Sequence, residues 1–395
     1  METKPKVQEN KLVLWLIFLV VLLAYGLFVG VILRRNSYDF SHFIIAGNIY
    51  VQPDQISSPI KILSDCGRGP KCGGYDGQFY YRLALDPFTN QRIQHGIMID
   101  LPALRMQRIF YPLTVWILSL GFDRAVPIIM VLANWLALGL IAVFAGKIMK
   151  LKGQSPYWGW LIAFYPAFLF SLARDLTEIF GIIFLVVAYW VILRDKKIWA
   201  GVLASLAVLS RETTLIFALG FFLAFLWEII IKKKKAGWPD VFVWLCPISV
   251  FIIWQTALRL IWKSGAVSSS IFYNINWPFS GLKYHLLNGN LSHAQNYIEF
   301  AFIIWLVCLA GYLFKSSRVH QGVKFAWLIA LGIFCLISKS IWVEDWSFMR
   351  AFTEVYFFSL LIILSNQSKI KYALAPIVLI MWLIFFKIAV FGQLF

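Results

Sequence analysis

Charged residues are scarce in this chain. Only 14% of its 395 residues are Asp, Glu, Lys or Arg, whereas 61% are hydrophobic and 17% are aromatic. Soluble domains carry about 25% charged residues. The composition therefore excludes an ordinary soluble domain and predicts a membrane protein with several spans.

Acidic residues are the scarcer of the two charge signs, with 19 Asp and Glu against 36 Lys and Arg and a net charge of +17. A basic balance can indicate nucleic-acid binding, but these basic residues form short clusters between long apolar runs. That arrangement is typical of cytoplasmic loops. We therefore expect membrane lipids, and no nucleic acid, around this protein. The sequence also has no nucleotide-sugar or dinucleotide motif, no lipidation motif and no obvious internal repeat.

Cysteine is rare, with five residues in the chain. Three of them lie in apolar runs and are expected to be ordinary buried thiols: Cys246, Cys308 and Cys335. Cys66 and Cys72 flank GRGPK in a polar loop. In an oxidising compartment these two would form a disulfide, and a pair of free thiols is the alternative.

Long apolar runs define the expected spans. The first, 12–33, is long enough to cross a bilayer and is followed by no small-residue cleavage site, so we expect a retained helix rather than a signal peptide. The segment RIFYPLTVWILSLGF (108–122) is short and contains Pro112. If it crossed the membrane, the later basic clusters would lie outside, so the positive-inside rule predicts that it does not span. The other expected spans are 125–146, 156–173, 176–193, 198–210, 213–231, 240–262, 296–314, 323–338, 350–365 and 372–392.

These runs predict an all-α bundle of about eleven spans, formed by the single domain 1–395, in the cytoplasmic membrane. The N-terminus would be cytoplasmic and the C-terminus external. Spans two to seven lie in 125–262 and spans eight to eleven in 296–392. Two large extracytoplasmic loops result, 34–124, which would carry surface helices, and 263–295.

Three expected outer turns each combine an arginine with an acid. Ionisable groups at the ends of apolar spans are costly and usually face an interior cavity, so they are candidates for a functional site. Plain ion pairs between helices are the alternative. The residues are Arg174, Asp175 and Glu178 in SLARDLTEIFG, Arg211 and Glu212 in LSRETTL, and Glu344, Asp345, Arg350 and Glu354 in VEDWSFMRAFTE.

The polar stretch YDGQFYYRLALDPF (75–88) lies in the first external loop. Asp76 would either serve chemistry or cap a surface helix that ends at Asp86-Pro87. Tyr80 and Tyr81 would either meet substrate or form an interfacial aromatic belt. Asp39 and His42 would place two metal ligands on one helical face, but two residues do not make a site, so a divalent metal is left open.

The stretch Tyr75-Asp76-Gly77-Gln78-Phe79-Tyr80-Tyr81 resembles the first external loop of the GT-C superfamily of integral-membrane glycosyltransferases. The surface segment 104–122 and the polar turns SLARDLTE and LSRETTL are similar to parts of the same superfamily. The combination of YDGQFYYRLALDPF, QRIFYP, ARDLTE and RET resembles the sequences of a group of bacterial membrane proteins associated with cell-surface glycopolymers. The resemblance covers about residues 35–215. This chain has Gly77 where the large members carry a second acid, and we expect this glycine to allow close approach of substrate.

The resemblance implies a sugar transferase that uses a polyprenyl-phosphate-linked sugar and a glycan, lipid or protein acceptor on the extracytoplasmic side. Asp76 would be the general base, with Asp39 as the second choice. Arginines would stabilise the charge of the leaving phosphate. These are Arg211 and Arg350, followed by Arg174 and Arg82. Tyr75 and Tyr80 would stack on sugars, Gln78 would bind substrate, and Asp175, Glu178 and Glu212 would orient the arginines or bind sugar hydroxyls. The alternatives are a transporter or flippase, a polymerase of lipid-linked glycans, and a non-catalytic assembly partner.

Overall fold

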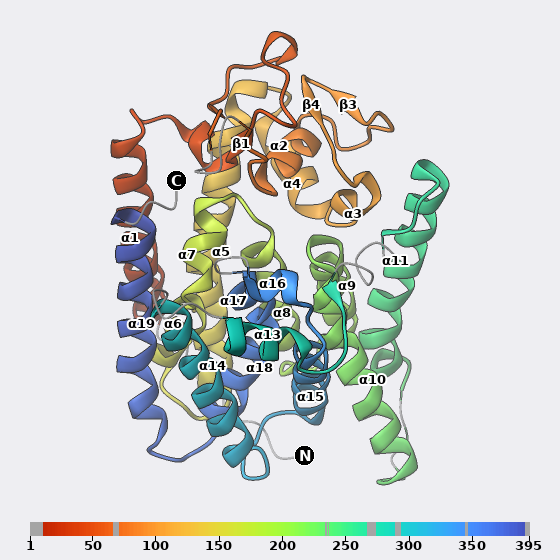
Figure 1. Cartoon of the computed structure of the whole chain (residues 1–395). Helices are drawn as coiled ribbons and strands as arrows, with labels where there is room; N and C mark the ends of the chain where they lie inside the picture. The colour runs from red at the N-terminus through yellow and green to blue at the C-terminus, as the bar shows by residue number, and fades with distance from the viewer. Residues whose placement is uncertain are drawn as a thin grey trace.

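The protein is nearly all helical, as the apolar runs predict. The structure, a computed structural model, describes residues 11–65, 71–233, 235, 237–266, 274–288, 294–343 and 347–391. Within these ranges, β-structure is limited to two pairs of two-residue strands. Figure 1 shows the long helices running roughly side by side, with a smaller, irregular layer at one end of the bundle.

Five helical segments are long and apolar enough to cross a membrane. Their outward side chains are large and apolar, as in Leu23 and Leu260, which is expected for faces in contact with lipid. The segments are α1 (Lys11–Arg35), Asp123–Leu151 with η3 (Asp123–Ala125) and α5 (Val126–Leu151), Glu212–Ile230 with η5 (Glu212–Thr214) and α10 (Leu215–Ile230), α11 (Trp238–Trp262) and α19 (Lys371–Phe391).

Shorter helices occupy most of the other predicted spans, so the count of eleven spans stays a prediction. The predicted single span 156–173 is wrong, because the chain there is broken into η4 (Pro156–Gly159), α6 (Trp160–Ala163) and α7 (Ala167–Ala173). Pro166 precedes α7 and lacks the amide hydrogen that a continuous helix requires. The other helices are α8 (Glu178–Ile192), α9 (Lys197–Ser210), α13 (Ser280–Asn288), α14 (Ala294–Leu313), α15 (Gln321–Cys335), α16 (Lys339–Val343), α17 (Ser347–Ala351) and α18 (Thr353–Leu364).

Residues 36–65 and 71–121, here termed the cap, form the irregular layer at the upper end of Figure 1. In the cap β1 pairs with β2 in parallel, and β3 pairs with β4 antiparallel. α4 lies in the predicted non-spanning segment 108–122 and packs against α2 and α5. The cap elements are η1 (Phe40–Ile44), β1 (Ala46–Gly47), η2 (Pro53–Gln55), β2 (Ile62–Leu63), α2 (Gly77–Leu85), β3 (Ile93–Gln94), β4 (Ile97–Met98), α3 (Pro102–Met106) and α4 (Phe110–Ser119).

α2 is buried on all sides, and this corrects two expectations. Tyr80 and Tyr81 are fully buried, so they do not form an interfacial belt. Gly77 was expected to let substrate approach. Instead, a Cβ at this position would lie 2.3 Å from the carbonyl oxygen of Arg174 and 2.9 Å from that of Ile44. The missing side chain therefore lets the start of α2 rest directly on the turn between α7 and α8.

The cysteines match the expectation in part. Cys246 and Cys335 are free and half-buried, whereas Cys308 is free and exposed rather than buried. Cys72 is disulfide-bonded. Cys66 lies outside the described residues, so the predicted Cys66–Cys72 pairing stays a prediction.

Candidate functional site

Buried ion pairs join three turns that are far apart in the sequence. Their centre is Glu178, the first residue of α8, whose side chain is fully buried. Its Oε1 accepts from Arg211 Nη1 at 2.5 Å and from Arg350 Nη2 at 2.6 Å, and Oε2 accepts from the Ser171 hydroxyl at 3.0 Å. One carboxylate thus fixes two guanidinium groups from other turns.

Arg211 is the inner of these two arginines. Its Nε donates to Oε1 of Glu354 at 2.8 Å, and its Nη2 donates to the backbone oxygen of Arg350 at 2.9 Å. Glu354 was noted in the sequence, but it was not chosen as a site residue. The three turns that were predicted to lie on the outer side therefore do supply a joint network, which includes a pair of buried acids, Glu178 and Glu354.

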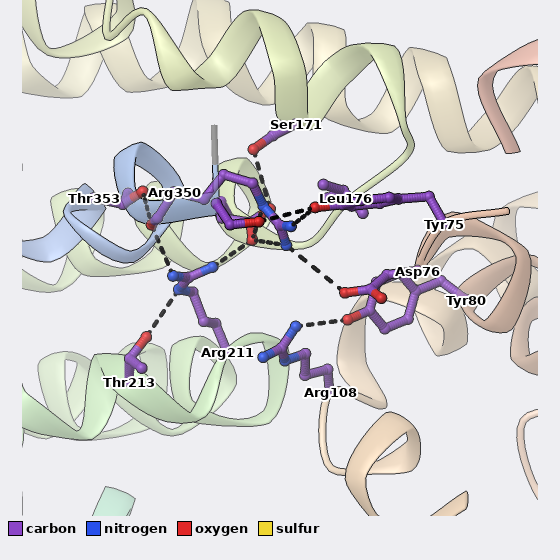
Figure 2. Close-up of polar contacts among 12 residues, drawn as sticks. Tyr75, Asp76, Tyr80, Arg108, Ser171, Leu176, Arg211, Thr213, Arg350 and Thr353 are labelled. Atoms are coloured by element: carbon purple, nitrogen blue, oxygen red, sulfur yellow. Dashed lines mark hydrogen bonds and ion pairs between the residues drawn. The ribbon is translucent and has the colours of Figure 1, made fainter. Parts of the chain in front are cut away.

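Arg350 connects the network to the cap. Its Nη1 donates to the Tyr75 hydroxyl at 2.7 Å, and its Nη2 lies 3.8 Å from Oδ2 of Asp76 (Figure 2). The ring of Tyr75 also stacks against Arg174, whose guanidinium carbon lies 4.3 Å from the ring centre. Tyr75 is therefore held between two cations, and the guanidinium of Arg174 covers one face of its ring.

Asp76 is at the N-cap position of α2, but its side chain makes no capping hydrogen bond. The capping alternative is therefore wrong. Oδ1 instead accepts from Arg105 Nη1 at 2.7 Å, and the side chain is 24% exposed. Burial raises the pKa of Asp76, but Arg105, Arg350 and Arg108 together hold it below its usual value. Asp76 is thus an ionised, accessible carboxylate at the edge of the network.

Arg105 and Arg108 are site residues that sequence reasoning missed. Arg105 is held by Asp100 and lies over the ring of Phe79, with its guanidinium carbon 4.5 Å from the ring centre. Arg108 donates through Nε and Nη2 to both oxygens of Glu212, and through Nη1 to the Tyr80 hydroxyl at 2.7 Å. The sequence did contain a signal for these two residues. They are arginines three residues apart, in the loop that holds Asp76 and just before an apolar segment.

Several predicted site residues have other roles. Gln78 bonds backbone groups of Gly47 and Gly73, and Arg82 donates to Thr89 and Gln94. Tyr80 is buried, so its ring cannot stack on a sugar as expected. Asp39 caps η1 by accepting from the Ser41 amide, and its role as second-choice base stays a prediction.

Asp175 does not orient an arginine, contrary to expectation. Its side chain is fully buried in the turn between α7 and α8, where its φ is +48°. Neither carboxylate oxygen has a hydrogen-bond partner among the described residues. Burial raises the pKa of Asp175 well above its usual value. Glu344 and Asp345 lie outside the described residues.

Metal ligands do not gather in the described part of the chain: no three His, Cys, Asp or Glu side chains meet as a metal site requires. The carboxylates of the network are engaged by guanidinium groups. As arranged here, these donors do not fit a divalent ion, and no step is derived through one.

An apolar cavity of about 210 Å³ lies near α17, the short helix that carries Arg350. It lies among α13, α14, α15 and α16 and is lined by apolar and aromatic side chains, together with Cys308 and Cys335. The cavity wall includes Trp342, which stacks on Phe348 with ring centres 5.2 Å apart. Phe348 is two residues before Arg350 on α17, so one stacked ring pair links the cavity wall to the helix that carries Arg350.

Comparisons with known proteins give one likeness. No protein family and no curated protein matches the sequence. The structure is similar to the crystal structure of the Archaeoglobus fulgidus oligosaccharyltransferase in the apo form, with a TM-score of 0.49 and 13% sequence identity. The match covers 95% of this chain and 56% of that chain, so the present chain spans little more than half of its length.

Proposed function

We propose that this protein is a membrane glycosyltransferase that moves a sugar from a polyprenyl-phosphate carrier to an acceptor hydroxyl on the extracytoplasmic side. The single observation that carries the proposal is the ionised, accessible carboxylate of Asp76 beside Arg350. A base and a phosphate-binding cation thus lie at one place, at the end of a bundle of apolar helices. The acceptor would be a glycan, a lipid or a protein.

The first requirement of the reaction is a base. The acceptor oxygen attacks the anomeric carbon, the bond from that carbon to the phosphate oxygen breaks, and the hydroxyl proton passes to Asp76. A positioned carboxylate makes this attack easier because the hydroxyl has a high pKa. The arginines around Asp76 keep it ionised, at the cost of making it a weaker base.

The second requirement is positive charge for the phosphate that leaves. Arg350 is the best placed, since its Nη2 lies between Glu178 and Asp76 and the side chain is 10% exposed. Arg211 is more deeply buried and is fully engaged by acids and a backbone oxygen. We therefore assign phosphate binding to Arg350, supported by Arg174, and assign to Arg211 the anchoring of Glu178 and Glu354.

The third requirement is a place for the carrier lipid. The cavity beside α17 is lined by Phe300, Phe334 and Trp342 among other apolar groups, and suits an isoprenoid chain better than a polar ligand. In our proposal the first isoprene units enter this cavity while the phosphate meets Arg350. This arrangement favours a lipid-linked donor over a soluble one.

The test compares the protein with its Asp76→Asn variant in lipid nanodiscs. Each is incubated with radiolabelled polyprenyl-phosphate sugars, with and without envelope extract, and release of sugar from lipid is followed. The matched control is Asp54→Asn, which changes an exposed aspartate of η2 in the same cap. Thermal unfolding of all three proteins shows whether the fold is retained.

Turnover by the unaltered protein and by Asp54→Asn, with its loss in a folded Asp76→Asn, would support the proposal. Turnover that survives in Asp76→Asn would disprove Asp76 as the base. If no donor is consumed by any of the proteins, the transferase proposal fails. A translocation assay with lipid-linked glycan would then test the flippase alternative.

A further inference from the structure

Two rows of side chains face each other where α2 meets the segment from α3 to α4. Asp76 and Tyr80 are four residues apart and share one face of α2. Arg105 and Arg108 are three residues apart on the opposing segment. Arg105 Nη1 lies 2.7 Å from Asp76 Oδ1, and Arg108 Nη1 lies 2.7 Å from the Tyr80 hydroxyl. The arginines therefore reach the two polar groups of α2 in register.

Arg105 is fixed from behind, independently of Asp76. Its Nε donates to Asp100 Oδ1 at 2.9 Å and its Nη2 donates to Asp100 Oδ2 at 2.7 Å, a bidentate pair. Asp100 Oδ1 also accepts from the backbone amide of Leu101 at 2.6 Å. The ring of Phe79 covers one face of the guanidinium. Only Nη1 of Arg105 is directed at Asp76.

The two oxygens of Asp76 have different surroundings as a result. Oδ1 makes the short bond to Arg105, whereas Oδ2 has the longer 3.8 Å contact with Arg350. A carboxylate that is held through one oxygen keeps lone pairs of the other for a new donor. The Asp76 side chain is 24% exposed, and Oδ2 is its oxygen without a short bond to Arg105.

We propose that Arg105 is a positioning residue for Asp76: anchored by Asp100, it holds Oδ1 so that Oδ2 faces the acceptor. The assignment of a reaction to Asp76 rests on the proposed function, but the pairing itself does not. Among the described residues Arg105 forms ion pairs with Asp76 and Asp100 and none with Glu178, so its effect on the Glu178 network passes through Asp76.

The first measurement needs no activity. A hydrophilic carbodiimide reacts with protonated carboxyl groups, so its extent of reaction at Asp76 over a pH series, read by peptide mass spectrometry, follows the titration of this residue. Arg105→Gln removes an opposite charge within about 4 Å, and at a fixed mildly acidic pH it should raise modification of Asp76 by about tenfold or more. Arg105→Lys should restore part of the protection.

The matched control is Arg92→Gln. Arg92 lies in the same cap, just before β3, and donates to the backbone oxygens of Ile99 and Asp100, without contacting the Asp76 carboxylate. The Arg92→Gln substitution should leave the titration of Asp76 unchanged. If Arg105→Gln does not fold, Asp100→Asn gives the second test, because it leaves Arg105 in place but removes its anchor. That variant should show a smaller shift in the same direction.

The second measurement is the pH dependence of kcat/KM for sugar release. In Arg105→Gln the acidic limb should move to higher pH, and Arg105→Lys should move it partly back. An unchanged carbodiimide titration in Arg105→Gln and Asp100→Asn would overturn the inference, even if the unaltered protein turns over donor. Absent turnover combined with the expected titration shift would instead overturn the proposed function and leave the pairing intact.

Discussion

The two ends of the helix bundle handle charge in opposite ways. At the cap end, Arg350 meets Glu178 across 172 residues of sequence, and both side chains are buried or nearly so. At the other end, Lys197 of α9 pairs with Asp240 of α11, and each side chain is 34% exposed. An open cavity of about 410 Å³ adjoins that pair and is lined by side chains of both signs as well as by Phe221 and His320.

This difference in burial means that ion pairs of the same residue types have different energetic roles at the two ends. A buried ion pair is expensive to desolvate and becomes strongly destabilising when one partner is removed. An exposed pair contributes little, because water and salt screen it. The ion pairs of the cap end are therefore held in a fixed arrangement at a cost, as a site requires, whereas the Lys197–Asp240 pair at the other end is partly solvated.

The largest expected effect comes from Glu178→Gln. The neutral side chain would leave Arg211 and Arg350 with too little negative charge in a buried place. We expect a loss of about 3–5 kcal/mol in the free energy of unfolding. Denaturant unfolding in detergent micelles measures it, with Asp240→Asn as the control at the other end. Equal losses in both variants would remove the contrast between the ends.

A smaller loss is expected from Gly77→Ala. The new Cβ would overlap the carbonyl oxygen of Arg174, so α2 would have to move away from the α7–α8 turn. The expected cost is about 1–3 kcal/mol. Gly73→Ala is the control, since a Cβ at that position meets nothing within 4 Å. If both substitutions were tolerated equally well, the close seating of α2 would not be needed.

The ion pairs of Asp76 should make part of the stability depend on pH. Its pKa in the folded protein is below that of an unfolded chain, so the stabilisation is complete above the unfolded value of about 3.9 and is lost as pH falls through the folded value. Asp76→Asn should therefore lower stability by about 1.5 kcal/mol at pH 6. Unfolding at pH 3–7 checks this: a difference that persists unchanged at the acidic end would contradict the ion pairing.

The smallest effect is expected at the exposed end. Lys197→Gln removes the partner of Asp240 and should cost less than about 1 kcal/mol. The loss should shrink further in 0.5 M salt, because screening weakens exposed pairs. Unfolding at low and high salt gives the comparison. A salt-independent loss of several kcal/mol would show that this end also holds buried charge.

Much of the helical framework could be predicted from the sequence. The runs 12–33, 240–262 and 372–392 correspond to α1, α11 and α19 to within a few residues, because a long apolar run has few alternatives to a helix. The run 156–173 was wrong because apolar length alone ignored Pro156 and Pro166. Whether all the shorter helices cross the membrane is a prediction that remains to be tested.

The candidate site was only partly predictable. Scarcity of charge singled out Glu178, Arg211 and Arg350, since a charge in an apolar chain needs a partner. It could not separate these residues from Asp175, which is buried without a partner in the described structure. Arg105 and Arg108 were not predicted because they lie in a polar loop, where charged residues are common and do not by themselves indicate a site.

The sequence by itself determined that the chain is helical and apolar, and that its acids and arginines recur at the ends of apolar runs, because local composition and run length decide those properties. Only the tertiary structure decided which arginine meets which acid. Those partners come from α2, α3, α8, η5, α17 and α18, and no pattern along the chain encodes their distances. The pairing depends on how the helices pack. The charge state and exposure of Asp76 depend in turn on that pairing.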